Sequence, residues 1–254
     1  RVRAPKAVRF PLYLRIPGWC DGASVQVDGK GVEPEGENQI KPLSYLVIDR
    51  EWTGGDTVTL RLPMRVEVVE WEQHGGAVSV RRGPLWYALK IGEQWKRVGG
   101  TDDWPVQEVH PTTPWNYGLQ VDPDDPEGSL EVVRGYRLDP SPKAPDSRDP
   151  VPFKHAHILL RKVPARKIPA WQLDRHGLVA VLQPGPVYSE EPLEFVTLVP
   201  MGCARLRIAV FPRVTSDPDA HHWQPPAKPA EPAFDVTVSH CFGGDRPAAI
   251  ARMK

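Results

Sequence analysis

The chain has 254 residues, of which 40% are hydrophobic and 25% are charged, fractions near those of ordinary globular proteins. Basic and acidic residues are equal at 32 each, so no net charge attracts the chain to nucleic acid. No apolar run approaches the roughly 18–20 residues of a membrane-spanning helix. We therefore expect a soluble protein that binds neither nucleic acid nor a membrane; its compartment stays open.

Proline is unusually common, at 30 of the 254 residues. Helix interiors reject proline because it lacks the backbone N–H and clashes with the preceding turn. Long helices should therefore be nearly absent, and the pattern favours an all-β fold.

The first predicted strand covers residues 8–16, where apolar side chains occupy every second position. Pro11 within it predicts an edge position or a bulge, because proline cannot donate a hydrogen bond to a neighbouring strand. The strand ends at a turn formed by Pro17-Gly18. A second strand, residues 24–27, leads into a hairpin turn at Asp28-Gly29.

The rest of the chain shows the same alternation of short strands and turns, without helical periodicity. Further strands are predicted at residues 45–49, 57–62, 64–71, 77–80, 82–91, 130–133, 157–163, 178–182, 193–199, 206–211 and 234–239. Long proline-rich loops are predicted at residues 99–128, 139–152 and 215–233. We predict two antiparallel β-sandwich, jelly-roll-like domains: residues 1–69, an incomplete first sandwich, and residues 70–254, the second.

The sequence contains no Gly-rich phosphate loop, no nucleophile elbow and no closely spaced cysteine pair. Cys20, Cys203 and Cys241 are far apart and odd in number, which argues against a disulfide framework. We interpret Cys20 and Cys203 as small buried hydrophobic residues. His155 and His157 would share one face of a strand, which can suit a metal, but without a close cysteine pair no metal site is predicted.

Glycoside hydrolysis generally requires two carboxylates at a fixed separation. The adjacent pairs Asp102-Asp103, Asp124-Asp125 and Glu190-Glu191 do not provide this, because neighbours on an extended chain point in opposite directions. We interpret them as solvated loop charges, and no catalytic residue is predicted.

The loop at 99–128 carries aromatic residues, Trp104, Trp115 and Tyr117, together with the amide of Asn116. Exposed rings can stack on sugars or contact a partner domain. Large aromatic residues more often pack into the core, which here would anchor the loop to its own domain. Packing is favoured, and these four residues are the candidate contacts to carbohydrate or to a partner.

Several segments together resemble the bacterial β-L-arabinofuranosidase family, glycoside hydrolase family 127 (GH127), in the family's order along the chain. They are Leu14-Arg15-Ile16-Pro17-Gly18-Trp19-Cys20, Trp52 with Gly55-Asp56-Thr57-Val58 and Leu62-Pro63-Met64, Arg82-Gly83-Pro84-Leu85-Trp86-Tyr87-Ala88-Leu89, Pro114-Trp115-Asn116-Tyr117-Gly118-Leu119, residues 165–171, Glu191-Pro192 with residues 196–200, and Gly202-Cys203-Ala204-Arg205-Leu206-Arg207-Ile208.

The resemblance implies an N-terminal (α/α)6 barrel whose zinc is held by a glutamate and cysteines, one of them the nucleophile, followed by two β-sandwiches. The family's adjacent cysteine pair has no counterpart in this sequence, and Cys20 belongs to the Pro17-Gly18-Trp19-Cys20 corner downstream of it. No catalytic residue carries over. The resemblance implies that this chain is the C-terminal sandwich region, with opening strands before Arg1, no cofactor of its own and the zinc in the absent barrel.

Two functions follow as expectations. The first is a non-catalytic unit that braces the barrel of an arabinofuranosidase-like hydrolase, with a homo-oligomer as a further expected assembly. The alternative is a carbohydrate-binding module that targets arabinose-containing plant glycans through its loop aromatics. A self-sufficient hydrolase is disfavoured because the sequence offers no nucleophile or carboxylate pair.

Overall fold

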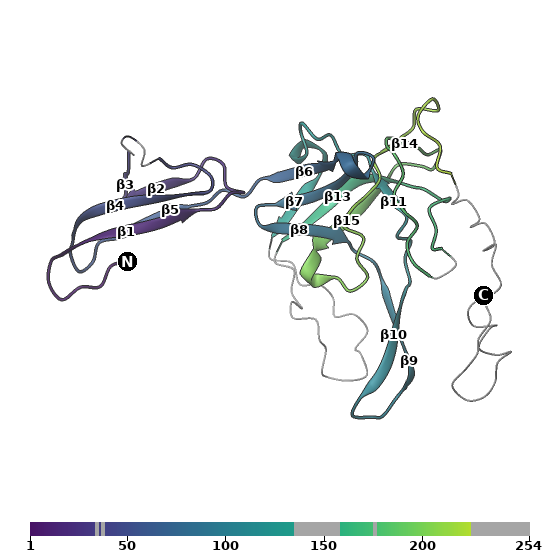
Figure 1. Ribbon diagram of the computed structural model, residues 1–254, viewed down its shortest axis with the longest axis horizontal. Helices are drawn as coiled ribbons and strands as arrows, with labels where there is room; N and C mark the ends of the chain where they lie inside the picture. Colours follow the sequence, from purple (N-terminus) through teal and green to yellow (C-terminus); the bar gives the residue numbers. More distant parts are fainter. Residues whose placement is uncertain (34–35, 37–38, 135–157, 175–176, 225–254) are drawn as a thin grey trace, which may run out of the picture. The chain divides into compact units, whose positions relative to one another are not determined.

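The structure is a computed structural model that describes residues 1–33, 36, 39–134, 158–174 and 177–224 (Figure 1). This part of the chain contains strands and three short 3-10 helices but no α-helix, so the predicted all-β fold class is confirmed. No helix within it is long and apolar enough to cross a membrane. Arg1–Trp223 form one compact unit, and of the second unit, Gln224–Lys254, only the first residue is described.

The N-terminal part of the unit contains two small antiparallel sheets. β1 (Val8–Ile16) pairs with β4 (Ser44–Trp52). The second sheet has the order β3 (Lys30–Gly31), β2 (Ser24–Val27), β5 (Val58–Arg61). The alternation in the sequence produces this arrangement, because every second side chain of β1 turns inward and the others face outward.

Three residues of the β1–β4 sheet, Ile16, Leu46 and Trp52, are completely buried. Pro11 lies opposite Asp49, and among the described residues β1 pairs with no strand other than β4, so the predicted edge position is confirmed. The predicted hairpin turn at Asp28-Gly29 is also confirmed, since both residues adopt positive φ, 51° and 77°.

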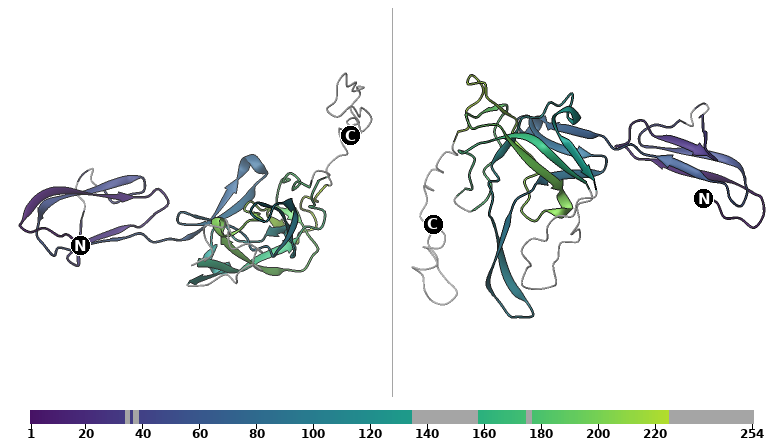
Figure 2. Two further views of the ribbon diagram at one scale, coloured as in Figure 1. Left: turned by 90° about the horizontal axis from the view of Figure 1, so that it is seen from below. Right: turned by 180° about the vertical axis from the view of Figure 1, so that it is seen from behind.

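A seven-stranded antiparallel sheet dominates the rest of the unit (Figures 1 and 2). Its order is β11-β13-β15-β8-β7-β6, with β12 also paired to β13. The strands are β6 (Val66–Trp71), β7 (Ala77–Arg82), β8 (Leu85–Leu89), β11 (Tyr117–Leu119), β12 (Glu131–Arg134), β13 (Ile158–Lys167) and β15 (Glu194–Pro200).

Both faces of this sheet are covered. The larger core combines inward residues of the strands with a second layer supplied mainly by connecting segments, including Ile168, Trp171, Phe211 and Trp223. The opposite face carries a smaller cluster of Ala88, Leu159, Val199 and Ala204. The result is a sandwich-like domain in which only one layer is a regular sheet.

The remaining elements lie outside this sheet. β9 (Glu93–Gly100) and β10 (Pro105–Pro111) form a two-stranded hairpin that extends away from the large sheet (Figure 1). β14 (Val187–Tyr188) and β16 (Val214–Thr215) form a short parallel pair. The 3-10 helices are η1 (Glu72–His74), η2 (Glu127–Ser129) and η3 (Met201–Cys203).

Some sequence predictions are corrected. The stretch 99–128, predicted as irregular loop, contains β10 and β11, and β9 was not predicted. Residues 178–182 and 206–211 form no regular strand, only isolated bridges at Val179 and Phe211. Their backbone hydrogen bonds, such as those from the Leu89 N–H to the Ile208 carbonyl and from the Ala180 N–H to the Gln172 carbonyl, do not continue into a ladder.

Other sequence predictions stay open. The predicted domain boundary near residue 69 falls within β6, and the division into two sandwiches stays a prediction. Residues 139–152, 225–233 and the predicted strand at 234–239 lie outside the described residues.

Candidate functional site

Three of the four candidate contact residues lie together where the chain enters β11. Asn116 is held in place by Ile168 through two hydrogen bonds: its side-chain Nδ2 donates to the Ile168 carbonyl at 3.0 Å, and the Ile168 N–H donates to the Asn116 carbonyl at 2.8 Å. The amide is therefore used to fix the connection between β11 and the end of β13.

Trp115 is half-buried against two further tryptophans. Its ring meets Trp171 edge-on at 5.4 Å between centroids, and Trp171 meets Trp223 at 5.6 Å. The Trp171 indole N–H donates to the Ala180 carbonyl at 3.0 Å. Sequence reasoning did not select Trp171 and Trp223, because each lies in a different irregular segment and nothing in the sequence brings them together.

Tyr117 is buried, and its hydroxyl donates to Glu194 Oε2 at 2.8 Å. The other carboxylate oxygen of Glu194 lies 2.7 Å from Lys167 Nζ. Burial, reinforced by the hydrogen bond to Glu194, raises the pKa of Tyr117 to about 12. The contacts from Lys167 and then Tyr117 lower the pKa of Glu194. The result is a neutral phenol bound to an ion pair at the rim of the core.

Trp104 is separate from this group, in the turn that joins β9 to β10. Its ring is 77% exposed. The turn is closed by its own backbone, with Trp104 N–H donating to Thr101 Oγ1 at 3.1 Å and Thr101 N–H donating to the Trp104 carbonyl at 3.2 Å. Val98 and Val106 near the same tip are also exposed. Among the four candidate contact residues, Trp104 offers the most open ring.

The cysteines that the structure describes show no sign of activation. Cys20 is completely buried, with its Sγ 3.7 Å from the Pro63 carbonyl oxygen, and burial followed by the charge of Asp21 raises its pKa. Burial also raises the pKa of the Cys203 thiol. A nucleophilic or metal-binding cysteine requires the opposite shift, toward the thiolate. Cys241 lies outside the described residues.

The zinc implied by the family resemblance does not fit the described part of the chain. No group of three or more histidine, cysteine, aspartate or glutamate side chains there is arranged to hold a metal ion. His155 and His157 lie outside the described residues. A structural or catalytic zinc site takes at least three such ligands.

The acidic pairs behave as surface charges where they are described. Asp102 pairs with Arg97 at 2.7 Å on the exposed hairpin, and Asp125 Oδ1 accepts the Gly128 N–H at 3.1 Å within its own turn. Glu190 is exposed. These carboxylates hold local turns and ion pairs rather than facing a common reaction centre.

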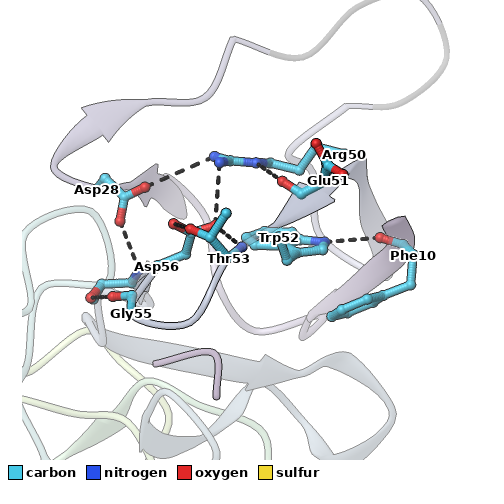
Figure 3. A network of polar contacts seen from close by, with 9 residues as sticks. Phe10, Asp28, Arg50, Glu51, Trp52, Thr53, Gly55 and Asp56 are labelled. Atoms are coloured by element: carbon cyan, nitrogen blue, oxygen red, sulfur yellow. Dashed lines mark hydrogen bonds and ion pairs between the residues drawn. The ribbon is translucent and has the colours of Figure 1, made fainter. Parts of the chain in front are cut away.

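A polar network stabilises the turn after β4 (Figure 3). Asp56 accepts the Thr53 N–H at 2.9 Å and the Thr53 hydroxyl at 2.8 Å, and it lies 3.3 Å from Arg50. These contacts lower the pKa of Asp56, with the backbone bond from Thr53 as the largest cause. Arg50 also lies 3.9 Å from Asp28 and stacks over Trp52 at 5.0 Å. The network links β4 to the β2 hairpin and has a structural role.

The outer face of the β1–β4 sheet carries large exposed apolar side chains. Tyr13 is 60% and Tyr45 58% exposed, and they are diagonal neighbours because Tyr13 pairs with Val47 and Tyr45 with Arg15. Leu43, just before β4, is 83% exposed and adopts φ 57°, a conformation that is unfavourable for leucine. We call Tyr13, Leu43 and Tyr45 the aromatic face.

The aromatic face and the Trp104 tip offer apolar contact area, and the Tyr117–Glu194–Lys167 group is satisfied within the fold. The two hydroxyl–carboxylate pairs described above, Thr53–Asp56 and Tyr117–Glu194, belong to the turn after β4 and to the rim of the core.

Comparisons with known proteins give one sequence match and several structural ones. Residues 1–64 match the family model "Beta-L-arabinofuranosidase, GH127 middle domain". No curated protein matches the chain significantly. A solved structure described as a glycoside hydrolase matches with a TM-score of 0.48 at 21% identity, over 83% of this chain and 29% of the other.

Two further solved structures are described as GH127 enzymes. A GH127 β-L-arabinofuranosidase from Geobacillus stearothermophilus T6 matches with a TM-score of 0.46 at 23% identity, over 84% of this chain and 27% of the other. A GH127 β-arabinofuranosidase matches with a TM-score of 0.42 at 17% identity, over 82% of this chain and 28% of the other. This chain therefore spans less than a third of the length of each of these three structures. The predicted resemblance is confirmed: residues 1–64 are similar to the middle domain of the GH127 β-L-arabinofuranosidases.

Proposed function

We propose that this chain is a non-catalytic β-sandwich region of a GH127-related enzyme and that it packs against the enzyme's catalytic domain. The observation that carries the proposal is the match of residues 1–64 to a GH127 middle domain. A middle domain has neighbours on both sides, and residues 65–254 of this chain follow it on one side. The catalytic domain is the neighbour we propose for the other.

The aromatic face supports a packing role. Tyr13, Leu43 and Tyr45 expose apolar surface on the matched segment, and apolar side chains that gather on one face are a feature of surfaces that another domain covers. Arg9 and Asp49, paired at 3.3 Å on the same face, would form a polar rim. Tyrosine suits such contacts because it combines a large apolar ring with a polar hydroxyl.

The same proposal assigns the chemistry to the catalytic domain. The described thiols have raised pKa values, and the described acidic pairs serve local turns. We therefore propose that any zinc and any nucleophile of the enzyme lie outside this chain.

A binding experiment tests the packing role. A GH127 catalytic domain produced without its own sandwich region would be titrated with this chain by calorimetry. The Tyr13→Ser/Tyr45→Ser variant should lose most of the binding heat, because it removes the two rings at the centre of the face. Thr59→Ala on β5, in the other small sheet, is the matched control and should bind like the unmodified chain. Equal binding by all three proteins would contradict the role of the aromatic face.

One observation favours a second function, binding of arabinose-containing glycans. Trp104 is 77% exposed at the tip of a projecting hairpin, with the ion-paired Arg97 and Asp102 close by in sequence. A flat ring flanked by polar groups can stack on a sugar and hydrogen-bond its hydroxyls. Affinity electrophoresis against arabinan tests this function. Retardation that Trp104→Ala abolishes would support it, and unchanged mobility across a broad glycan panel would remove it.

The oligomeric state is a separate proposal. A homo-oligomer would cover some of the exposed apolar surface, and light scattering after size exclusion would show a mass above 28.4 kDa. A monomeric mass at all concentrations would contradict it.

A further inference from the structure

Arg82, at the end of β7, is the one buried charged residue in the part of the chain that the structure describes. It is 6% exposed. Its side chain points to the core face of the sheet, the face that also carries Val78 and Val80, because residues two apart in a strand share a face. An arginine side chain keeps its charge at every pH at which proteins are folded.

The guanidinium of Arg82 lacks an oxygen acceptor among the described residues. Its Nε is buried without a hydrogen-bond partner, and its Nη1 reaches only the Met64 thioether sulfur at 3.9 Å. Sulfur of this kind is a weak acceptor. A buried charge without a counter-charge destabilises the folded state, so folds rarely keep one unless something compensates it.

The neighbouring Arg81, in contrast, has an oxygen acceptor for its guanidinium. It points to the opposite face and makes two hydrogen bonds to Glu67 Oε2, from Nε at 3.1 Å and from Nη2 at 2.5 Å. Its guanidinium also lies 5.9 Å from the Trp86 ring. Arg81 is only half-buried, yet it has the carboxylate that the more deeply buried Arg82 lacks.

The surroundings of Arg82 define what could compensate it. Val66 lies directly opposite on β6 and Leu85 on β8. The positive charge of Arg82 acts on the buried Tyr87, whose pKa it lowers against the larger, opposite effect of burial. These neighbours are apolar apart from the Tyr87 hydroxyl, which donates to the Ile158 carbonyl at 3.4 Å. A single monovalent anion balances this one charge, whereas a phosphate dianion would leave excess negative charge in an apolar setting.

We propose that Arg82 is a receptor for one carboxylate group that is not among the described residues of this chain, held by the paired N–H donors of the guanidinium. The flat, two-pronged fit between guanidinium and carboxylate makes this the favoured anion. Because Arg82 is nearly enclosed, the ligand presents a single projecting carboxylate rather than a flat surface. Two sources carry that chemistry, a glutamate or aspartate side chain of another polypeptide and the carboxylate of a sugar acid. The inference is independent of the proposed function.

The test measures the thermal unfolding midpoint of the chain by near-ultraviolet circular dichroism. Sodium acetate replaces sodium chloride at constant ionic strength, so that only the specific anion changes. Acetate should raise the midpoint by about 2–4 °C at 0.1 M, because a ligand that binds only the folded state stabilises it. N-acetylglutamate amide and galacturonate replace acetate in two further arms, and the stronger response identifies the source.

Three variants complete the test. Arg82→Met has a similar length without charge, so in chloride it should unfold at or above the unmodified midpoint and should not respond to acetate. Arg81→Met is the matched control and should respond fully. Arg82→Lys keeps the charge but loses the paired donors, so its response to acetate should be smaller than that of the unmodified chain. This variant replaces Arg82→Met in the test if the methionine variant fails to fold.

Two results would overturn the proposal. One is an acetate response of the same size in the unmodified chain and in both Arg82 variants, which would show an effect unrelated to Arg82. The other is no response in the unmodified chain together with a lower midpoint for Arg82→Met, which would show that the chain itself compensates the charge.

Discussion

The hydroxyl of Tyr117 donates a hydrogen bond to Glu194 at 2.8 Å, which joins the first residue of β11 to the first residue of β15 across β13. Lys167 completes the group from the end of β13, 2.7 Å from the same carboxylate. Three strands are therefore held at one rim of the core by a single carboxylate.

This group predicts an acid-dependent loss of stability. Glu194 has a lowered pKa in the folded chain, so its stabilising effect is complete above its unfolded pKa of about 4.3 and is lost as pH falls through the lower folded value. Glu194→Gln should lower the free energy of unfolding by only about 1 kcal/mol at pH 7, because the group is partly exposed. It should also weaken the pH dependence of this free energy between pH 5 and pH 3. Urea unfolding at these pH values measures both effects. Glu190→Gln is the control. If the Glu194 variant shows the same pH dependence as the unmodified chain, the prediction is contradicted.

A second prediction concerns alkaline pH. Burial raises the pKa of Tyr87 to about 12, so the folded state keeps this phenol neutral where the unfolded chain ionises it near pH 10. Stability from this residue is present below about pH 10 and is lost as pH rises toward about 12. Tyr87→Phe should reduce the alkaline decline in unfolding free energy. Substitution of the exposed Tyr45 by phenylalanine should leave the alkaline decline in unfolding free energy unchanged. A similar decline in both variants would contradict the prediction.

The turn between β7 and β8 predicts a costly glycine substitution. Gly83 has φ +57°, and a Cβ there would meet Met64 Cγ at 2.8 Å. Gly83→Ala should lower the free energy of unfolding by about 1–2 kcal/mol, because the left-handed conformation alone costs that much. Gly99→Ala is a suitable comparison, since nothing lies within 4 Å of its added Cβ. Denaturant unfolding compares the two, and equal stability would show that the turn relaxes.

Leu43 predicts a substitution that stabilises. Its φ of 57° is unfavourable for leucine, and the side chain is 83% exposed, so little packing offsets the strain. Leu43→Gly should therefore raise the free energy of unfolding by about 0.5–1 kcal/mol, whereas Leu43→Ala should not. If the glycine variant is less stable than the unmodified chain in denaturant unfolding, the packing of the Leu43 side chain near Gly18 contributes more than the strain costs.

The sequence predicted the strands that have one buried face. In β1 the alternation of Phe10, Leu12, Leu14 and Ile16 matches inward positions, and that pattern exists because one side meets the core. β9 and β10 escaped prediction for the opposite reason. Their hairpin is solvated over most of its surface, so polar residues occupy both faces. The sequence there lacks the alternation of apolar and polar residues that predicts a strand.

The candidate site was less predictable. Trp115 and Tyr117 could be selected from the sequence, but their partners Trp171 and Glu194 are 56 and 77 positions away, and only the fold brings them together. Likewise, Arg81 and Arg82 form one basic doublet in the sequence, and the pleat of β7 sends one to a carboxylate and the other into the core. Local sequence patterns do not predict such contacts between residues that are far apart in the chain.

The most direct test of the proposed non-catalytic role is the activity of the purified chain itself. Release of arabinose from a β-L-arabinofuranoside would be followed in the presence of zinc and a thiol reductant, with a complete GH127 enzyme as the positive control. A non-catalytic chain should give no release above the rate of the buffer. Reproducible turnover that co-purifies with the chain would contradict its assignment as a non-catalytic region.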